Sequence, residues 1–526
     1  MTKMTCITAI FVMFIASLPA YANEDCAVTA GVDDFYADGW GFNKKNERFQ
    51  SRTSINKSNV GQLAVKWAFV LEDDMSPHSF PAVSEDTVFI GTQSGTLYAL
   101  DRETGCTRWT YEAGDKIRTP VTHGILPDGE ALLFFGTLKG HTHAVSAASG
   151  EVRWVNNIAE HSMTMQTGAT LYHDGQLFVP VSSTELIYAF LPWYGCCTFR
   201  GSLIAMDAAS GEINWRTYMT DEPVVQGTHT GFVQMWGPSG APIWSAPTID
   251  AERGLVLVGT GENYSSPASE MSDSIVAMDI KSGEVKWWQQ YLAEDAFNVA
   301  CAIPGHPNCP VEDGPDLDFG APPILTTTPD GDDIVFGGQK SGGVYALSPD
   351  TGERIWERTF GRGGLLGGIH WGMAVNPETG LLFVPINDMQ LFYKISEGES
   401  KPGMYALDMA TGELRWSTPM ETSCEGRTQC NTGLSAAITA TSDLVFAPGL
   451  DGFVWAYDAE TGEIVWQFDT VDQFAATNAE FANGGTIDVH GPMIAGDMMF
   501  ILSGYGSQSL KGGNAFLAFQ LTEASE

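Results

Sequence analysis

Seven segments of the chain share one alternation of apolar and polar positions. Each segment alternates apolar residues up to an Ala and an Asp or Ser, continues through a Thr-Gly or Ser-Gly turn, and ends on a tryptophan. The copies lie 45 to 72 residues apart and end at Trp109, Trp154, Trp215, Trp287, Trp356, Trp416 and Trp466. The alternation predicts a half-buried strand, and the turn leads to a second strand that carries the tryptophan. Glycine supplies the positive φ that this turn requires.

A further apolar run precedes each copy, so each repeat predicts four short strands, which is the blade of a β-propeller. An eighth tryptophan, Trp67, has no repeat before it, and the segment 514–521 ends the chain as a third strand without a fourth. We therefore expect an all-β fold of eight blades, in which 63–70 pairs beside 514–521 and closes the ring. Closure removes the exposed sheet edges. The alternative is seven blades with loose ends.

The N-terminal stretch predicts export from the cytoplasm. Residues 1–22 combine an early lysine, an apolar run and the cleavage pattern Ala20-Tyr21-Ala22, which is typical of a signal peptide. A membrane anchor is the alternative, but the run is short for a span, and we expect no membrane span elsewhere. The interpretation is a signal peptide at 1–22, an N-terminal extension at 23–58, a propeller at 59–526, and a periplasmic location.

Charge and cysteines narrow the class further. The formal net charge of −37 argues against a nucleic-acid partner, which needs a basic surface. In an oxidising compartment, Cys301 and Cys309 are expected to form a local loop bridge, as are Cys424 and Cys430, which leaves Cys26 to pair with Cys106. The adjacent Cys196 and Cys197 could be two buried thiols. A bridge between neighbours is strained, but it is favoured here because the other cysteines outside the signal peptide pair off.

Long connections are predicted to gather on one face of the ring, over its axis. If strands run A to D from the centre outward, the B–C and D–A connections share a face, and these include 183–200, 218–243, 262–273, 288–320 and 417–436. We expect function on this loop face.

Several chemically suggestive residues fall at strand ends on this face. Glu185, Asn263 and Lys340 follow B strands; Arg118, Trp244, Asp316, Asp318, His370 and Trp371 lie at the starts of A strands. Carboxylates and amides suit a hard cation, Arg and Lys suit an anionic ligand, and Trp suits a flat ligand. Each residue alone has a common structural explanation, such as a solvated turn or a core position, but their convergence on one face favours a site. The sequence has no dinucleotide or P-loop motif and no C-x-x-C-H haem attachment motif.

The repeats resemble those of the pyrroloquinoline quinone (PQQ) dependent alcohol dehydrogenases, which are eight-bladed propellers. The segments CCTFRG at 196–201 and NCPVEDGPDLDFGAPP at 308–323 resemble the polyvinyl alcohol dehydrogenase type in particular. The resemblance covers nearly all of the chain after the signal peptide.

The resemblance implies a role for each candidate. A Cys196–Cys197 disulfide would lie against one face of the quinone and Trp244 against the other. Glu185, Asn263 and Asp318 would hold Ca²⁺, and Asp318 would be the catalytic base, with Asp316 as the alternative. The remaining predicted cofactor contacts are Lys340, Arg118, Arg200, Ser182, His370 and Trp371.

Three departures from the methanol dehydrogenase branch concern the substrate pocket more than the cofactor. The cysteine pair follows the metal Glu here instead of preceding it, His78 stands where that branch has a first-blade Glu, and Ser435 stands near a missing Trp.

The expected activity is oxidation of an alcohol, such as a secondary alcohol or polyol, to the carbonyl. Ca²⁺ would act as a Lewis acid and Asp318 as the base, and an external acceptor, a cytochrome c, would take the electrons. The alternative is a non-enzymatic scaffold resembling the outer-membrane barrel-assembly lipoprotein. That scaffold would need neither the cysteine pair nor the Glu, Asn and Asp set, and it would carry a lipidation motif, which the sequence lacks.

Overall fold

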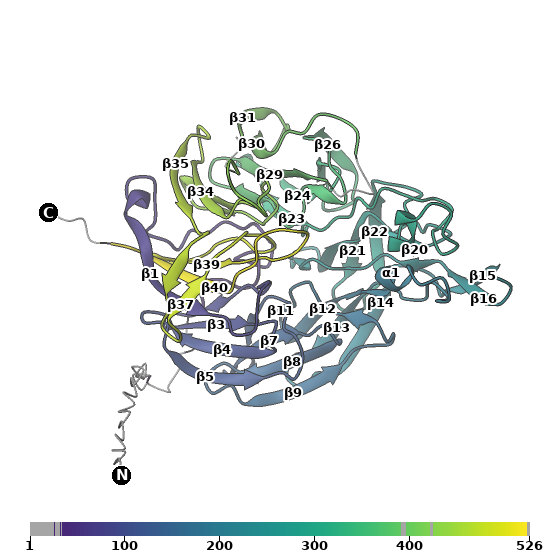
Figure 1. Cartoon of the computed structure of the whole chain (residues 1–526), viewed down its shortest axis with the longest axis horizontal. Coiled ribbons are helices and arrows are strands. Elements are labelled where there is room, and N and C mark those ends of the chain that lie inside the picture. Colours follow the sequence, from purple (N-terminus) through teal and green to yellow (C-terminus); the bar gives the residue numbers. More distant parts are fainter. Residues whose placement is uncertain (1–25, 27–31, 33, 391–395, 421–423, 523–526) are drawn as a thin grey trace, which may run out of the picture.

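Eight antiparallel sheets, six of four strands and two of five, surround a central axis in the computed structural model of the chain (Figure 1). The structure describes residue 26, residue 32 and residues 34–390, 396–420 and 424–522. The first four blades are β2–β5 (Ala82–Val83, Thr87–Gly91, Thr96–Asp101, Thr107–Glu112), β6–β9 (Thr122–Ile125, Ala131–Gly136, His141–Ser146, Val152–Asn157), β11–β14 (Leu171–His173, Gln176–Ser183, Ser202–Asp207, Ile213–Tyr218) and β18, β19, β21 and β22 (Thr248–Asp250, Leu255–Gly259, Ser274–Asp279, Val285–Gln290).

The second four blades are β23–β26 (Ile324–Thr327, Asp333–Gly338, Gly343–Leu347, Arg354–Thr359), β28–β31 (Ala374–Asn376, Leu381–Met389, Gly403–Asp408, Leu414–Pro419), β32–β35 (Thr439–Ala440, Leu444–Pro448, Phe453–Asp458, Ile464–Asp469) and β38, β39, β40 and β1 (Met493–Ala495, Met498–Ser503, Ala515–Leu521, Leu63–Val70). Short additions are β10 (Thr164–Met165), β15 and β16 (Val224–His229, Val233–Gly237), β17 and β20 (Ser239–Gly240, Asn263–Ser265), β27 (Leu366–Gly368), β36 and β37 (Gln473–Ala475, Phe481–Asn483), α1 (Glu185–Tyr188), η1 (Val60–Gln62) and η2 (Val299–Ala302).

The predicted ring closure is confirmed. Strand β1 pairs antiparallel with β40, from Leu63 opposite Leu521 to Val70 opposite Ala515. The last blade therefore takes its outer strand from the N-terminal side of the chain and its three inner strands from the C-terminal side. The pairing runs along the whole of β1, with one register shift between Val65 and Trp67, and so covers the edge of β40 at the join.

The repeat motif works by joining each blade to the next. The Asp of the motif holds its turn: the Asp101 carboxylate accepts hydrogen bonds from the backbone N–H and the hydroxyl of Thr104, at 2.9 and 2.8 Å. The motif glycine lies under the tryptophan of the preceding blade, where a Cβ would come within 3 Å of the ring. The pairs are Gly105 under Trp67, Gly150 under Trp109, Gly211 under Trp154, Gly283 under Trp215, Gly352 under Trp287, Gly412 under Trp356 and Gly462 under Trp416. Trp67 thus docks the last blade onto the first.

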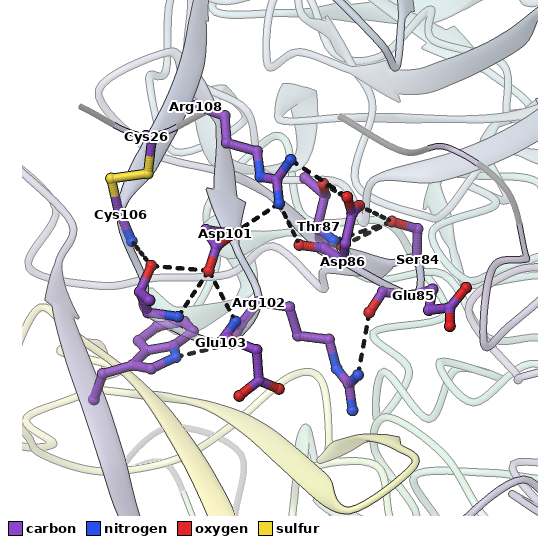
Figure 2. Close-up of polar contacts among 12 residues, drawn as sticks. Cys26, Ser84, Glu85, Asp86, Thr87, Asp101, Arg102, Glu103, Cys106 and Arg108 are labelled. Carbon is purple, nitrogen blue, oxygen red and sulfur yellow. Dashed lines mark hydrogen bonds and ion pairs between the residues drawn. A yellow bond between two sulfur atoms is a disulfide. The ribbon is translucent and has the colours of Figure 1, made fainter. Parts of the chain in front are cut away.

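All four predicted disulfides are present: Cys26–Cys106, Cys196–Cys197, Cys301–Cys309 and Cys424–Cys430. Figure 2 shows the first of them at the turn between β4 and β5, where Arg108 donates to Asp101 at 2.8 Å beside the bridge. This bridge ties the N-terminal segment to the first blade.

Residues 35–56 form a plug across the end of the axis opposite the long loops, a feature that the sequence did not predict. The backbone of this plug hydrogen-bonds to inner strands around the ring, for example from Tyr36 N to Val83 O, from Ile249 N to Lys44 O and from Ala440 N to Arg48 O, at 2.8–2.9 Å. The fully buried Arg48 guanidinium lies 4.4 Å from the Trp40 ring centroid and donates to Ile438 O in the seventh blade at 2.6 Å. Trp40 packs in one apolar cluster with Trp371 and Trp244, so the plug supports the centre of the ring from below.

Candidate active site

A cavity of about 300 Å³ opens at the centre of the loop face. Its wall includes most of the residues predicted to form the site: Arg118, Ser182, Trp244, Asp316, Asp318, Lys340, His370 and Trp371. These residues come from the second to sixth blades, and the inner ends of the strands bring them together. The cavity lies on the loop face over the axis, where the sequence led us to expect a site.

Two carboxylates and one ammonium group form the charged wall of this cavity. Lys340 Nζ donates to Asp316 Oδ1 at 2.7 Å and to Asp318 Oδ2 at 3.1 Å. Trp244 Nε1 donates to the same Asp318 oxygen at 2.9 Å, and the backbone N–H of Glu262 donates to Asp318 Oδ1 at 3.1 Å. All three charged side chains are at least nine-tenths buried, so their interactions are little screened by water.

The environment separates the proton affinities of the two aspartates. Burial raises the pKa of Asp316 to about 7, against the opposing effect of Lys340. Burial would also raise the pKa of Asp318, but Lys340 and the hydrogen bonds from Glu262 lower it below its ordinary value. The carboxylates keep Lys340 charged, because they raise its pKa more than burial lowers it. At neutral pH, Asp318 is therefore the aspartate that is held as the anion.

Glu262 is a third acid in this cluster, and the sequence analysis missed it. It is 3% exposed, and its ligand oxygen lies within 4.8 Å of those of Asp316 and Asp318. Burial and the two aspartates raise its pKa well above the ordinary value. Glu262 could have been found from its position, because it directly precedes Asn263 after the same strand. Of these two neighbours, only Asn263 was predicted as a metal ligand.

The opposite side of the cavity is aromatic and cationic. The rings of Trp244 and Trp371 meet edge to face at 5.1 Å, and His370 joins them with its Nδ1 2.9 Å from Ser435 Oγ. The Arg118 guanidinium lies 6.0 Å from the Trp371 ring centroid and has no hydrogen bond to another described side chain or backbone group. Tyr505, which sequence reasoning also missed, lines this side from a C-terminal loop that carries no recognisable motif.

Glu185 lies outside the cavity wall, fully buried behind it. Its carboxylate accepts hydrogen bonds from Tyr194 Oη at 2.7 Å, Thr198 N at 2.9 Å and Phe199 N at 2.8 Å, and His161 Nε2 lies 3.4 Å away. Burial raises the pKa of Glu185, but these partners outweigh it and the pKa is lowered. In this arrangement Glu185 anchors the loop that carries the cysteine pair.

The cavity wall also does not include Asn263, Arg200 or the cysteine pair, which contact other residues. Asn263 Oδ1 accepts from Ser269 N at 2.7 Å, and the Arg200 guanidinium donates to Thr220 O and stacks on Tyr218. The Cys196–Cys197 disulfide is buried in an apolar cluster that includes Tyr264, a residue that does line the cavity. The structure thus places these predicted residues around the site and not in its wall.

Comparison with known proteins identifies the class. Residues 38–307 match the family described as the β-propeller domain of glucose, ethanol and alcohol dehydrogenases, and residues 340–508 match the outer membrane protein assembly factor BamB. Among solved structures, the quinohemoprotein alcohol dehydrogenase ADHIIG from Pseudomonas putida HK5 superposes with a TM-score of 0.70 at 19% identity, covering 95% of this chain and 84% of that one. A europium-containing methanol dehydrogenase gives 0.69 at 17% identity, covering 94% and 99%. The fold is that of the quinoprotein dehydrogenase propellers.

Two relatives of higher identity narrow the family. The polyvinylalcohol dehydrogenase of a Pseudomonas species is 38% identical over 500 residues, 92% of this chain and 76% of the relative. The polyvinylalcohol dehydrogenase of Sphingopyxis sp. (strain 113P3) is 36% identical over 504 residues, with the same coverage. The chain belongs to the PQQ-dependent alcohol dehydrogenase family, and these relatives place it with the polyvinyl alcohol dehydrogenases. It is therefore an enzyme and not the scaffold of the alternative interpretation. Among the described residues, no helix has the length and apolar character to cross a membrane.

Proposed function

We propose that the protein oxidises a secondary alcohol or polyol, including polyvinyl alcohol, to the carbonyl in the periplasm, with PQQ and a hard cation such as Ca²⁺. The observation that carries this proposal is the cavity wall, where Asp316, Asp318 and Lys340 face a site bounded by Trp244 and Arg118. The activity for which the two polyvinylalcohol dehydrogenases are named supports the substrate class.

The cavity suits a flat, anionic cofactor. Trp244 and Trp371 offer aromatic surface for a planar ring system, which buries well against indole. Arg118 has no hydrogen-bonding partner among the described residues, and its planar guanidinium matches a carboxylate. Bound PQQ would supply the two-electron acceptor of the reaction, and the chain would supply binding and orientation.

The acidic cluster suits a hard cation. Glu262, Asp316 and Asp318 bring three carboxylates together, and the one ammonium group of Lys340 pairs with the two aspartates. A buried excess of negative charge is costly unless it is protonated or bound to a metal, and oxygen donors are the ligands of Ca²⁺ and similar ions. We propose that these three residues hold the cation, with Glu262 in place of the predicted Glu185 and Asn263, whose oxygens are engaged elsewhere.

Within this site, Asp318 acts as the base. A carboxylate oxygen of Asp318 accepts the proton of the alcohol hydroxyl as the hydrogen on the carbinol carbon leaves with its electron pair. Trp244 Nε1 and Lys340 Nζ fix the orientation of that carboxylate, and Lys340 stabilises its negative charge before the transfer. Asp316 remains the alternative base, since its pKa of about 7 lets it take up a proton near neutral pH.

The electrons leave to an external acceptor, for which we propose a cytochrome c. The sequence has no covalent haem motif, and a relative that is 25% identical over 516 residues is named lupanine 17-hydroxylase [cytochrome c]. The proposed periplasmic location follows from the signal peptide predicted at 1–22, which lies outside the described residues.

Reduction of a dye by purified protein tests the proposal. The protein, treated with chelator and then given PQQ and Ca²⁺, is expected to reduce the dye with short secondary alcohols, and to do so only when both additions are present. An absorption spectrum of the loaded protein checks that PQQ is bound. If PQQ binds and no alcohol reduces the dye, the proposed reaction is wrong; if PQQ does not bind, the cofactor assignment is wrong.

A further inference from the structure

Three loops, the first of which lines the cavity, carry large apolar side chains that are exposed to solvent. They are residues 185–195, which contain α1; the hairpin β15–β16; and residues 299–311, which contain η2. Their exposed apolar side chains are Ile187, Tyr188, Phe190, Trp193, Val224, Val225, Phe232, Ile303 and Val311. We name this set the apolar apron. Figure 1 shows the hairpin projecting from the rim of the ring near α1.

The apron is held together by specific contacts. The buried Asn308 side chain donates to the carbonyls of Ala189, Leu191 and Tyr194 at 3.0–3.1 Å, and its Oδ1 lies 2.8 Å from His229 Nε2 on the hairpin. The Cys301–Cys309 disulfide closes the loop that carries Asn308. One amide thus joins all three loops, so the apolar side chains lie on an ordered surface.

The apron is continuous with the cavity. Leu186 and Ile187 line the cavity wall, and Ile187 is also 54% exposed. Phe190 and Trp193 lie in the same loop, a few residues after Ile187, and their side chains are 46% and 69% exposed. A cavity of about 300 Å³ that also holds a cofactor can take only a short stretch of substrate, and Ile187 offers a longer molecule a path from the cavity onto the apron.

We infer that the apron binds the carbon backbone of a polymeric alcohol while one of its hydroxyl-bearing carbons occupies the cavity. This inference rests on the proposed function and adds a second binding region to it. A neutral chain of methylene and hydroxyl-bearing carbons buries apolar surface on aromatic side chains and needs no counter-charge. An ordered surface also binds a flexible chain at a smaller entropic cost.

Other occupants fit the surface less well. A second copy would bring together two molecules that each carry a formal charge of −37. A basic protein partner would bind a surface of this chain that is rich in carboxylates. The side chains that define the apron are aliphatic and aromatic instead.

The double variant Phe190→Ser/Trp193→Ser tests the inference, because neither residue lines the cavity. Loss of two aromatic contacts is expected to lower kcat/KM for polyvinyl alcohol about tenfold through KM, because both rings would bury apolar surface against the polymer. The kcat/KM for pentane-2,4-diol should not change. The matched control is Ile355→Ser on the outer strand β26, where the side chain is 53% exposed, and it should leave both substrates unaffected.

Binding without turnover separates this inference from the proposed function. Cofactor-free protein is expected to be retained on an immobilised polyvinyl alcohol matrix, and the double variant to elute early, even if the wild type oxidises no alcohol at all. Equal kcat/KM for the polymer in variant and wild type would overturn the inference. Two other results for the double variant would also overturn it. A loss of self-association, measured by light scattering, would assign the apron to a second copy. A loss of cytochrome c reduction with the short diol, while dye reduction persists, would assign it to a protein partner.

Discussion

Asp316 and Asp318 are two residues apart, both contact Lys340, and still differ in proton affinity. Asp318 receives hydrogen bonds on both oxygens, from Glu262 N and from Trp244 and Lys340, whereas Asp316 is held by Lys340 through Oδ1. Hydrogen bonds to the ionised form favour it, so Asp318 stays an anion where Asp316 takes up a proton. The choice of base depends on this difference.

We expect Asp318→Asn to bind PQQ and lose turnover by on the order of 10²–10⁴-fold, because an amide cannot accept the alcohol proton. Absorbance of the bound quinone and steady-state dye reduction measure the two effects separately. Asp316→Asn is the matched comparison and should retain more activity. If Asp318→Asn keeps full activity while Asp316→Asn loses it, Asp316 is the base.

Glu262→Gln should weaken cation binding by about tenfold or more, because it removes one of three carboxylates from the cluster. Luminescence of bound Tb³⁺ or Eu³⁺, excited through nearby tryptophan, reports binding independently of activity, and competition with Ca²⁺ ranks the ions. Glu185→Gln, in contrast, should change cation affinity little and lower the melting temperature, since Glu185 anchors a loop through Tyr194, Thr198 and Phe199. The reverse pattern would restore the role that sequence resemblance gave to Glu185.

Asp488 should make the stability of the cofactor-free protein depend on pH. Burial raises its pKa to about 6 from an ordinary 3.8, although Ser435 and Arg118 act against the shift. The folded state therefore holds a proton that the unfolded state releases between about pH 4 and 6, so the contribution of this group is largest below pH 4 and is lost as pH rises to 6. Urea unfolding should show that, as pH rises from 4 to 7, the free energy of unfolding of Asp488→Asn increases by about 2 kcal/mol relative to that of the wild type. A constant difference across that range would contradict the assignment.

At the scale of the element, the blade repeat is a contact between one blade's tryptophan and the next blade's turn. The turn glycine must have a positive φ and must also leave room for the indole. Gly412 meets both demands, with φ +68° and a hypothetical Cβ 2.7 Å from the Trp356 ring. Gly254 has φ +67° and nothing within 4 Å of the same point, so it isolates the effect of backbone strain.

Gly254→Ala should lower the free energy of unfolding by about 1 kcal/mol, from the left-handed backbone alone. Gly412→Ala should cost about 1–3 kcal/mol more, because its methyl group must displace the indole of Trp356. Chemical denaturation of both variants gives the difference. Equal losses would mean that the docking contact adds no packing constraint.

The pattern of elements was predictable because it depends on local alternation and on turn chemistry. The sequence therefore predicted the blades, the closure by 63–70 and the face that carries the site. It also predicted that Asp316, Asp318, Lys340 and Trp244 lie in one wall, because the inner strand ends of a propeller converge at the axis regardless of the conformation of the loops.

The partners of individual polar atoms were not predictable in the same way. Glu185 and Asn263 lie at the expected strand ends, but Thr198, Phe199 and Ser269 on the following loops reach back to their oxygens. Glu262, one position from Asn263, points into the cluster instead. Which of two neighbouring residues faces a site depends on loop conformation, and alternation does not determine it. The plug was missed because residues 35–56 have no repeat and no alternation.

At the scale of the molecule, the ring is joined twice, by β1 beside β40 and by the plug across the axis. Arg48 is central to the second joint: it donates to Ile438 O, Thr439 Oγ1 and Trp40 O at 2.6–3.0 Å. Burial lowers its pKa to about 9, so it stays charged at neutral pH. A buried cation with several carbonyl partners makes the plug's position specific.

Arg48→Ala should lower the free energy of unfolding by about 3 kcal/mol, through the loss of charge-assisted hydrogen bonds and of contact with Trp40. It should also make 35–56 accessible to protease before the blades are cut, which mass spectrometry of early fragments detects. Lys57→Ala is the control, since Lys57 lies just beyond the plug and its side chain, which pairs with Asp458 of the seventh blade, is 48% exposed. Simultaneous cleavage of plug and blades would show that the plug has no separate stability.

The plug also decides how a long substrate can approach. Residues 35–56 bond to inner strands around the ring, and Trp40 packs against Trp371 and Trp244, so a chain that enters the cavity meets the plug beyond these indoles. A polymer therefore cannot thread through the ring and be oxidised at successive carbons as it advances. It must dip a loop or an end into the cavity and withdraw it by the same way, so oxidised positions should be scattered along each chain and shared among many chains from the first turnovers.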